Sequence, residues 1–145
     1  VYLLTGRPLT EHFARTAPPL PGLQVLPLGL TLDAALQRER ITRRVDAQFS
    51  RGVTAEVQAL LAQGVPATAH AFSGLVYRQV IELLQGVRGP AETRDLIITE
   101  NVKYARRQRM WFRQERGVQW IAGPGERDEA FREARSIVRC FLQPA

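Results

Sequence analysis

Apolar side chains recur every three to four residues along most of the chain, which is the spacing of an amphipathic helix. The segments with this period are bounded by capping residues, prolines and glycines, as helix ends usually are. Thr31 or Asp33 can cap the first of them, and Pro90 lies where a helix start is expected. The pattern predicts helices over residues 33–50, 54–64, 74–86, 90–116 and 128–142.

Two short apolar segments have the character of strands. Residues 24–29 alternate in polarity and contain the apolar pair Val25 and Leu26, which favours a strand buried in a parallel sheet. Residues 118–122 lie between glycine-containing turns and form the second candidate. Residues 1–4 resemble the end of a helix, and residues 14–22 form a proline-rich connector. The expected fold class is therefore mainly α with two short strands.

The positive charge of the chain is local. The 145 residues are 45% hydrophobic, enough for one domain with a core, and carry a formal net charge of +6. Residues 38–51 hold five arginines and two acids, and residues 99–116 hold six basic residues and two acids. Because these two segments account for the whole excess, the charge indicates a binding footprint for a polyanion.

The segment 99–116 is predicted to be a helix with a cationic side. Tyr104, Gln108 and Trp111 project to the side opposite most of the basic residues. None of the arginines between 106 and 113 has an acid three or four residues away, so helical ion pairing is missing. An uncompensated cationic face of this kind favours binding to phosphate groups.

Arg40 and Arg44 form a second candidate site, one helical turn apart beside an apolar stripe. Neither has an acid at helical spacing, whereas Arg43 follows Glu39 by four residues. Two converging guanidinium groups suit a diphosphate, whose oxygens accept forked hydrogen bonds. The alternatives are a solvated basic face or pairing with acids from elsewhere in a larger protein.

Other residue types add no specialised site. Cys140 is the only cysteine, which excludes a disulfide framework, and we expect it to be buried in the last helix. His12 and His70 lack the spacing of metal ligands. No apolar run approaches the ~20 residues of a membrane span, so we expect a soluble cytoplasmic protein. The last helix mixes acids with Arg132, Arg135 and Arg139 and is expected to be a solvated surface.

The segment Arg-Arg-Gln at 106–108, followed by Trp-Phe-Arg at 111–113, resembles the C-terminal signature of the tRNA dimethylallyltransferases. Val1-Tyr2 and the Thr-Gly-Arg-Pro-Leu segment at 5–9 are similar to a segment of the same family. Further matches in the family order are Arg40, Ile41, Arg43, Arg44, Val45, Phe49, Gly52, Glu56, Val57, Leu60, Tyr77, Arg78, Gln79, Val118, Gln119 and Trp120.

This resemblance implies transfer of a dimethylallyl group from dimethylallyl diphosphate to N6 of the adenosine 3′ of the anticodon, with Mg²⁺ assisting. The family carries a GxxxxGK[ST] phosphate-binding loop and an aspartate base near its N-terminus, and neither is found here. We therefore expect this chain to be the C-terminal part of a doubly wound α/β P-loop enzyme and to be a monomer. We expect it to contain no catalytic residue and no metal ligand, and to be inactive alone. Residues 1–22 would end a helical insertion and 23–145 would complete the catalytic domain.

The resemblance also assigns site residues. Arg40 and Arg44 are expected to bind the diphosphate. The arginines of the 106–113 segment are expected to contact tRNA phosphates, and Gln108 to make a specific hydrogen bond. The full set expected to contact the tRNA anticodon stem-loop is Ser73, Gly74, Leu75, Val76, Tyr77, Arg78, Arg106, Arg107, Gln108, Arg109, Met110, Trp111, Phe112 and Arg113.

Two points stay open at this level. Trp111 can stack on a base or belong to the core, whereas Tyr104 and Phe112 are expected in the core. Val76 stands where the family has glycine, and a β-branched residue does not adopt positive φ comfortably. Either the turn of the family does not need a positive φ, or this loop is rearranged. Without the diphosphate site, the chain would be a non-catalytic helical RNA-binding module.

Overall fold

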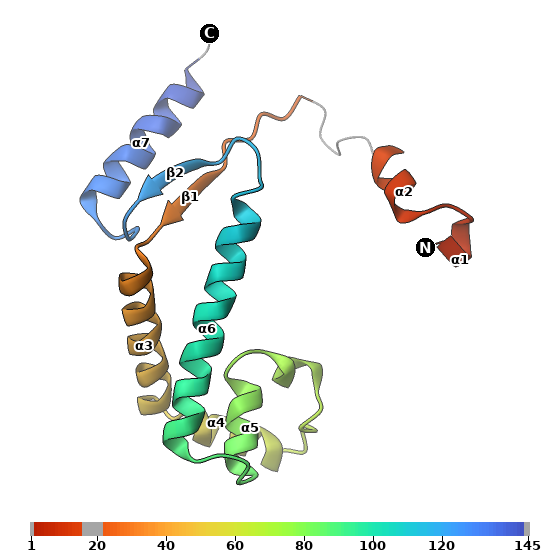
Figure 1. The fold of residues 1–145 in the computed structure, drawn as a ribbon, viewed down its shortest axis with the longest axis vertical. Coiled ribbons are helices and arrows are strands. Elements are labelled where there is room, and N and C mark those ends of the chain that lie inside the picture. Colours follow the sequence, from red (N-terminus) through yellow and green to blue (C-terminus); the bar gives the residue numbers. More distant parts are fainter. Residues whose placement is uncertain (1, 16–21, 144–145) are drawn as a thin grey trace.

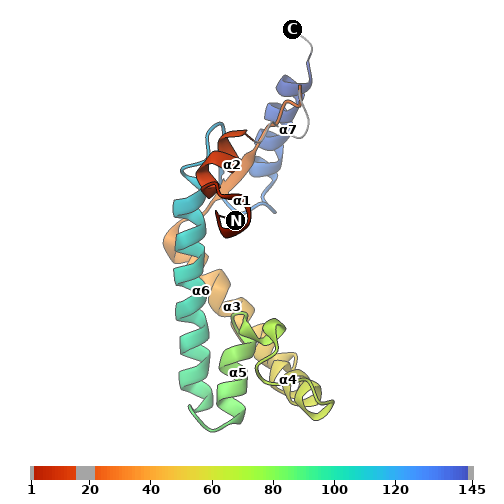
Figure 2. The same cartoon turned by 90° about the vertical axis from the view of Figure 1, so that its right-hand side faces the viewer.

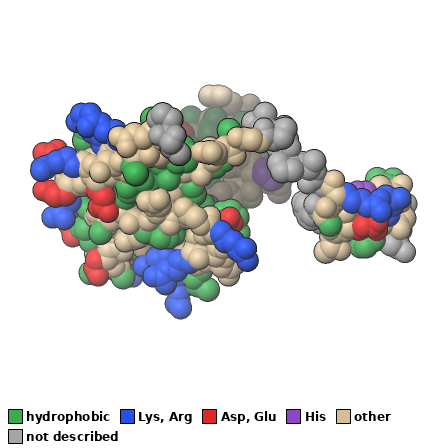
Figure 3. All heavy atoms as spheres, turned by 90° about the horizontal axis from the view of Figure 1, so that it is seen from above, with side chains coloured by type: hydrophobic (Ala, Val, Ile, Leu, Met, Phe, Trp, Pro, Cys, Tyr) green, Lys and Arg blue, Asp and Glu red, His purple; other side chains and the backbone are tan. Residues whose placement is uncertain are grey.

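The computed structural model describes residues 2–15 and 22–143. Two short helices, α1 (Tyr2–Thr5) and α2 (Leu9–Arg15), stand apart from the other elements in Figures 1 and 3. The helix α2 was not expected from the sequence, and most of the predicted connector lies outside the described residues. The remaining elements form a small sheet at one end and a helical cluster at the other (Figure 1).

The sheet consists of two parallel strands, β1 (Leu28–Thr31) and β2 (Gln119–Ala122). Leu28 pairs with Gln119, and the register continues to Thr31 opposite Ala122. β1 begins four residues later and ends two residues later than predicted, because pairing with β2 determines its position. Gly29 lies against Trp120, and a Cβ built on it would come within 2.7 Å of the indole ring. Only glycine therefore fits at this position of β1.

The hydrophobic core lies at the other end of the molecule, among four helices. These are α3 (Ala34–Ser50), α4 (Val53–Ala62), α5 (Tyr77–Leu84) and α6 (Pro90–Phe112), with the 3₁₀ helix η1 (His70–Ser73) before α5. Figure 2 shows α6 extending from this cluster to the sheet. The buried core residues are Ile41, Val45, Val53, Val57, Phe72, Val76, Val80, Ile81, Ile97 and Ile98.

The helix boundaries follow from local capping. The Asp33 carboxylate accepts hydrogen bonds from the Ala35 and Leu36 backbone N–H groups at 2.8 and 3.3 Å, so it caps α3. These bonds lower the pKa of Asp33. α6 begins at Pro90 as predicted but ends four residues earlier than expected. After Phe112 the backbone tightens into i→i+3 bonds, and Gly117 then turns the chain with a φ of 80°.

The last helix, α7 (Asp128–Leu142), has the predicted bounds and packs on β2. Positive and negative side chains alternate along the left-hand edge of Figure 3, the side on which α7 lies in Figure 1. Cys140 is exposed, so the prediction of a buried cysteine was wrong: α7 covers a two-stranded sheet too narrow to bury that position. Among the described residues, no helix combines the length and apolar character required to cross a membrane.

Candidate anion groove and nucleic-acid surface

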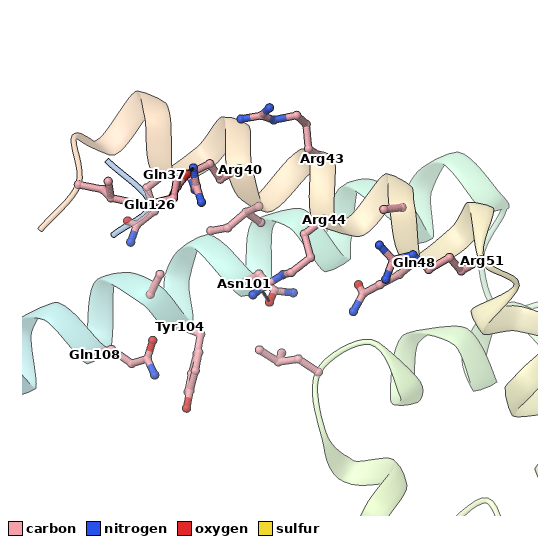
Figure 4. Close-up of a pocket in the computed structure, with 15 residues that line it drawn as sticks. Gln37, Arg40, Arg43, Arg44, Gln48, Arg51, Asn101, Tyr104, Gln108 and Glu126 are labelled. Carbon is pink, nitrogen blue, oxygen red and sulfur yellow. Dashed lines mark hydrogen bonds and ion pairs between the residues drawn. The ribbon is translucent and has the colours of Figure 1, made fainter. Parts of the chain in front are cut away.

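A cavity of about 1150 Å³ lies between α3 and α6 (Figure 4). One wall comes from α3 and the other from α6, and the loop before α5 and the β2–α7 connection each add one residue. We call this cavity the anion groove. Its lining residues are Leu32, Gln37, Arg40, Ile41, Arg43, Arg44, Ala47, Gln48, Arg51, Leu75, Asn101, Tyr104, Ala105, Gln108 and Glu126.

Arg44 is held in the anion groove by a neutral partner. Its Nη2 donates to Oδ1 of Asn101 at 2.9 Å. Asn101 is only 7% exposed, and its Nδ2 donates to the Ile97 carbonyl at 2.8 Å, which fixes the orientation of the amide. Because an amide carries no charge, the guanidinium of Arg44 is positioned without being neutralised.

Arg40 is held differently, by an ion pair with Glu126 from the β2–α7 connection. The hydrogen bond from Arg40 lowers the pKa of the Glu126 carboxyl, and the charges of Arg40 and Arg43 add to this effect. Local spacing could not reveal this acid, since Glu126 is 86 residues away from Arg40 along the chain. Arg40 has no acid at helical spacing, and the tertiary fold supplies one from a distant part of the chain.

Arg43, between them, serves as an internal reference. It lies 3.5 Å from Glu39 on the same helix, as the spacing predicts, and Figure 4 shows it pointing away from α6. Arg40, Arg44 and Arg51 point from α3 toward the space between the helices in the same view. The anion groove therefore collects positive charge on one wall.

The loop before α5 contains a strained residue, Val76. Val76 is buried and adopts φ 84° and ψ −61°, so this β-branched residue does take the positive φ that the sequence made unlikely. Its N–H donates to Oε1 of the fully buried Gln79 at 2.8 Å, which holds the turn closed. Tyr77 donates through its hydroxyl to Glu56 on α4 at 2.7 Å, and this bond raises the pKa of Tyr77.

The predicted tRNA residues of this loop are thus divided. Leu75 lines the anion groove, whereas Val76 belongs to the core. Ser73 donates to the His70 carbonyl at 2.7 Å, and Gly74 and Arg78 are exposed. The structure therefore brings one residue of the loop, Leu75, to the groove.

The last turns of α6 carry exposed aromatic side chains together with arginines. Trp111 is 59% exposed, and its ring meets that of Phe112 edge-on with centroids 4.8 Å apart. Arg107 lies over the ring of Tyr104 at 5.9 Å, a cation–π distance. Within the described part of the chain, no ion pair is found for Arg106, Arg107, Arg109 or Arg113.

The prediction that Tyr104 and Phe112 belong to the core was wrong, since they are 46% and 44% exposed. The physical reason is length: the helical core ends near Ala105, and α6 continues beyond it. Gln108 and Phe112 line a smaller cavity of about 390 Å³ beside β1 and Trp120. We call residues 102–113 the exposed end of α6.

Several groove residues were not identified from the sequence. Asn101, Gln48 and Arg51 line the cavity but match no recognised motif. For Asn101 a signal existed, because an amide four residues after Ile97 lies on the apolar side of a helix, where it needs a partner. For Glu126 the sequence contained no such signal.

The donors of the anion groove do not suit a divalent metal ion. Mg²⁺ prefers carboxylate and other oxygen ligands. Of the described residues that line this cavity, Glu126 alone has a carboxylate, and it is paired with Arg40. Among the described residues, no cluster of three or more His, Cys, Asp or Glu side chains could hold a metal.

Comparison with known proteins gives a consistent result. A family model described as IPP transferase matches residues 1–115. A tRNA dimethylallyltransferase of Thermomicrobium roseum is 42% identical over 127 residues, which cover 86% of this chain and 38% of that protein. One of Pelotomaculum thermopropionicum is 33% identical, covering 97% of this chain and 44% of that protein.

The fold is shared with solved structures. A tRNA isopentenylpyrophosphate transferase from Bacillus halodurans matches 90% of this chain and 42% of its own, with a TM-score of 0.76 at 24% identity. The chain thus spans about two fifths of the length of the relatives it matches. Since the family model covers most of the sequence, including the paired arginines and the exposed end of α6, the chain belongs to the IPP transferase family.

Proposed function

We propose that this chain forms part of a tRNA dimethylallyltransferase, which transfers a dimethylallyl group from dimethylallyl diphosphate to N6 of the adenosine 3′ of the anticodon. In this proposal the chain supplies the diphosphate-binding arginines and much of the tRNA surface. The catalytic base and the phosphate-binding loop belong to the family but match no residue of this sequence.

One observation carries the proposal: the residues expected for the two substrates line the same cavity. Arg40 and Arg44 lie on the α3 wall of the anion groove, and Gln108 lies on the α6 wall (Figure 4). A prenyl transfer requires the diphosphate and the acceptor base to approach one another, and a shared cavity allows this. Leu75 extends the same cavity to the loop before α5.

In the proposed reaction the arginines act on the leaving group. As the allylic C–O bond breaks, negative charge grows on the departing diphosphate, and preplaced guanidinium groups stabilise that charge. Arg44 is the better prepared of the two because Asn101 orients it without neutralising it. The cationic lining of the anion groove offers no suitable ligand set for Mg²⁺, so we derive no step through a metal ion here.

The exposed end of α6 is proposed to hold the RNA. Arg106, Arg109 and Arg113 are without an acidic partner among the described residues and are free to contact phosphates. Trp111 and Phe112 offer exposed aromatic faces beside them, suited to stacking on an unpaired base. Together they suit the anticodon stem-loop, in which the target base must leave its stack to reach a pocket.

A second candidate is a helical RNA-binding module without chemistry. The exposed end of α6 favours it equally well, because phosphate and base contacts require no reaction centre. The two candidates differ at the anion groove: a pure RNA-binding module has no need of an oriented, unneutralised arginine such as Arg44 inside a cavity.

Calorimetric titration with inorganic pyrophosphate separates the candidates. The R44A variant is expected to lose about 10- to 100-fold in affinity, since a charge-assisted hydrogen bond is worth about 1.5–3 kcal/mol. R38A is the matched control, because Arg38 is exposed on the same helix and is not among the residues that line the groove. Equal losses in both variants, or no binding of pyrophosphate by the unmodified chain, would remove the prenyltransferase proposal and leave the RNA-binding module.

A further inference from the structure

The two arginines assigned to the diphosphate have partners of opposite kinds. Arg44 is bound by the neutral, buried amide of Asn101, whereas Arg40 is bound by the carboxylate of Glu126. Glu126 is the one acidic residue among those lining the anion groove. The Glu126 carboxylate therefore occupies the position at the Arg40 guanidinium that an oxygen atom of a bound anion would take.

We propose that Glu126 is an internal counter-ion of the anion groove, which a ligand must displace from Arg40, and that it makes the groove select diphosphates over single phosphates. This inference rests on the proposed function, because it assumes that Arg40 and Arg44 bind the same anion.

The Arg40–Glu126 pair is suited to exchange. The two side chains are 39% and 60% exposed, and ion pairs at such exposure contribute little to stability because water screens them. Glu126 lies in the connection between β2 and α7, outside any strand or helix. Its side chain can leave Arg40 without breaking a backbone hydrogen bond of the sheet.

Selectivity follows from the charge balance. A single phosphate can bind Arg44 alone, but it then lies near the Glu126 carboxylate and is repelled by it. If it displaces Glu126 instead, it exchanges one anion for another at Arg40 with little gain. A diphosphate has oxygens enough to engage both guanidinium groups, which lie one helical turn apart, and so offsets the loss of the internal pair.

Asn101 makes the opposite contribution at Arg44. Because its amide is neutral, a ligand at Arg44 replaces no anion and meets the full charge of the guanidinium. The anion groove thus has one arginine ready for the first phosphate and one that is available only in exchange for Glu126.

The test compares the affinities of inorganic phosphate and inorganic pyrophosphate for the chain and for two matched variants, by calorimetry. E126Q removes the internal counter-ion. E39Q is the control, because the Glu39 carboxylate is about as exposed as that of Glu126 and pairs with Arg43 within α3. In E126Q we expect phosphate affinity to rise about three- to fivefold and pyrophosphate affinity to rise less, so that their ratio narrows. E39Q should leave the ratio unchanged.

The outcomes distinguish this inference from the proposed function. If pyrophosphate binds through Arg44 but E126Q behaves like E39Q, the counter-ion role is overturned and the proposed function stands. If none of the proteins binds pyrophosphate, the proposed function fails, and the selectivity for diphosphates fails with it, even where E126Q binds phosphate more tightly than E39Q. Absence of binding of either anion to every variant overturns both.

Discussion

The two ends of α6 differ in how their charged and apolar side chains are used. The first half of the helix contains all of its buried residues, Thr93, Ile97, Ile98 and Asn101. Its arginine, Arg94, is fixed by Asp46 on α3 through two hydrogen bonds of 2.6 and 3.0 Å. The exposed end of α6, from residue 102 onward, carries four arginines without a described acidic partner. It also carries four exposed aromatic or apolar side chains, Tyr104, Met110, Trp111 and Phe112.

The first half of α6 therefore packs in the core, and the exposed end of α6 is the part to examine for ligand binding. In a folded protein, a cation that serves the fold is usually neutralised by a neighbour, as Arg94 is. Cations left without partners repel one another and destabilise the helix slightly, so their retention calls for a ligand. The same comparison applies on α3, where Arg43 is paired within its helix and Arg44 is not.

The largest expected effect is on stability at the buried half. Ile97 is fully buried, and Ile97→Ala should reduce the free energy of unfolding by about 2–5 kcal/mol, because it leaves a cavity in the core. Met110→Ala, at a 56% exposed position of the same helix, should change it by less than ~0.5 kcal/mol. Urea unfolding followed by circular dichroism measures both; similar losses would contradict the division of α6.

The next effect is on RNA affinity at the exposed end. Replacing Arg106, Arg109 and Arg113 by alanine should remove about 1 kcal/mol of binding per phosphate contact at 0.1 M salt, roughly 100-fold in total. The slope of log affinity against log salt should fall by about 3. Fluorescence anisotropy with a labelled anticodon stem-loop provides the measurement.

The control for this variant removes the same charge elsewhere. Arg132, Arg135 and Arg139 lie together on α7 among acids and were assigned no site. Their triple alanine variant should bind the stem-loop within a few fold of the unmodified chain. If both triple variants lose affinity equally, net charge and not the exposed end of α6 determines RNA binding.

A smaller effect is expected for base stacking. Trp111→Ala should weaken binding of a single-stranded or loop RNA by about 1–3 kcal/mol, with little change in the salt slope, because stacking involves no phosphate. Phe131→Ala, at an aromatic position of α7 that is 62% exposed, is the control. Because the chain also contains Trp120, the part of the RNA-induced fluorescence quenching that is lost in Trp111→Ala reports the same contact. An unaffected affinity would assign Trp111 to packing against a protein surface.

The smallest effect is a pH dependence in the buried half. The hydrogen bond from Arg94 lowers the pKa of Asp46, and the charge of Arg94 adds to this. A lowered folded-state pKa contributes stability above the unfolded pKa, and this contribution disappears as the pH falls through the folded value. Asp46→Asn should therefore reduce the free energy of unfolding at pH 7. Below about pH 4, the variant should lose less stability with falling pH than the unmodified chain does.

Asp95→Asn is the appropriate comparison for Asp46→Asn. Asp95 also accepts a hydrogen bond from Arg94, at 3.0 Å, but its side chain is 73% exposed. Urea midpoints at pH 3 and pH 7 should differ less in D46N than in D95N. If the urea midpoint falls by the same amount between pH 7 and pH 3 in both variants, the pairing of Asp46 with Arg94 is not the source of the pH dependence.

Much of the fold followed from local signals. The helix start at Pro90 and the bounds of α7 were predicted correctly, and the structure selects Asp33 from the two caps considered for α3. Each of these features depends on residues within one turn of the boundary. The start of β1 was missed by four residues, since the position of a strand is determined by pairing with its partner and not by the local apolar run. The exposure of Tyr104 and Phe112 was missed for a related reason: helical periodicity gives the side of a helix, not whether another element covers it.

The family, the helical period, the cationic end of α6 and the pair Arg40 and Arg44 could be identified from the amino-acid sequence alone, because they depend on residue identity and short spacing. Which arginines keep their charge could be seen only in the folded chain, because Asn101 and Glu126 reach Arg44 and Arg40 across 57 and 86 residues of sequence. Partners at such separations are fixed by the packing of α3 against α6 and by the path of the β2–α7 connection, and no local pattern encodes them.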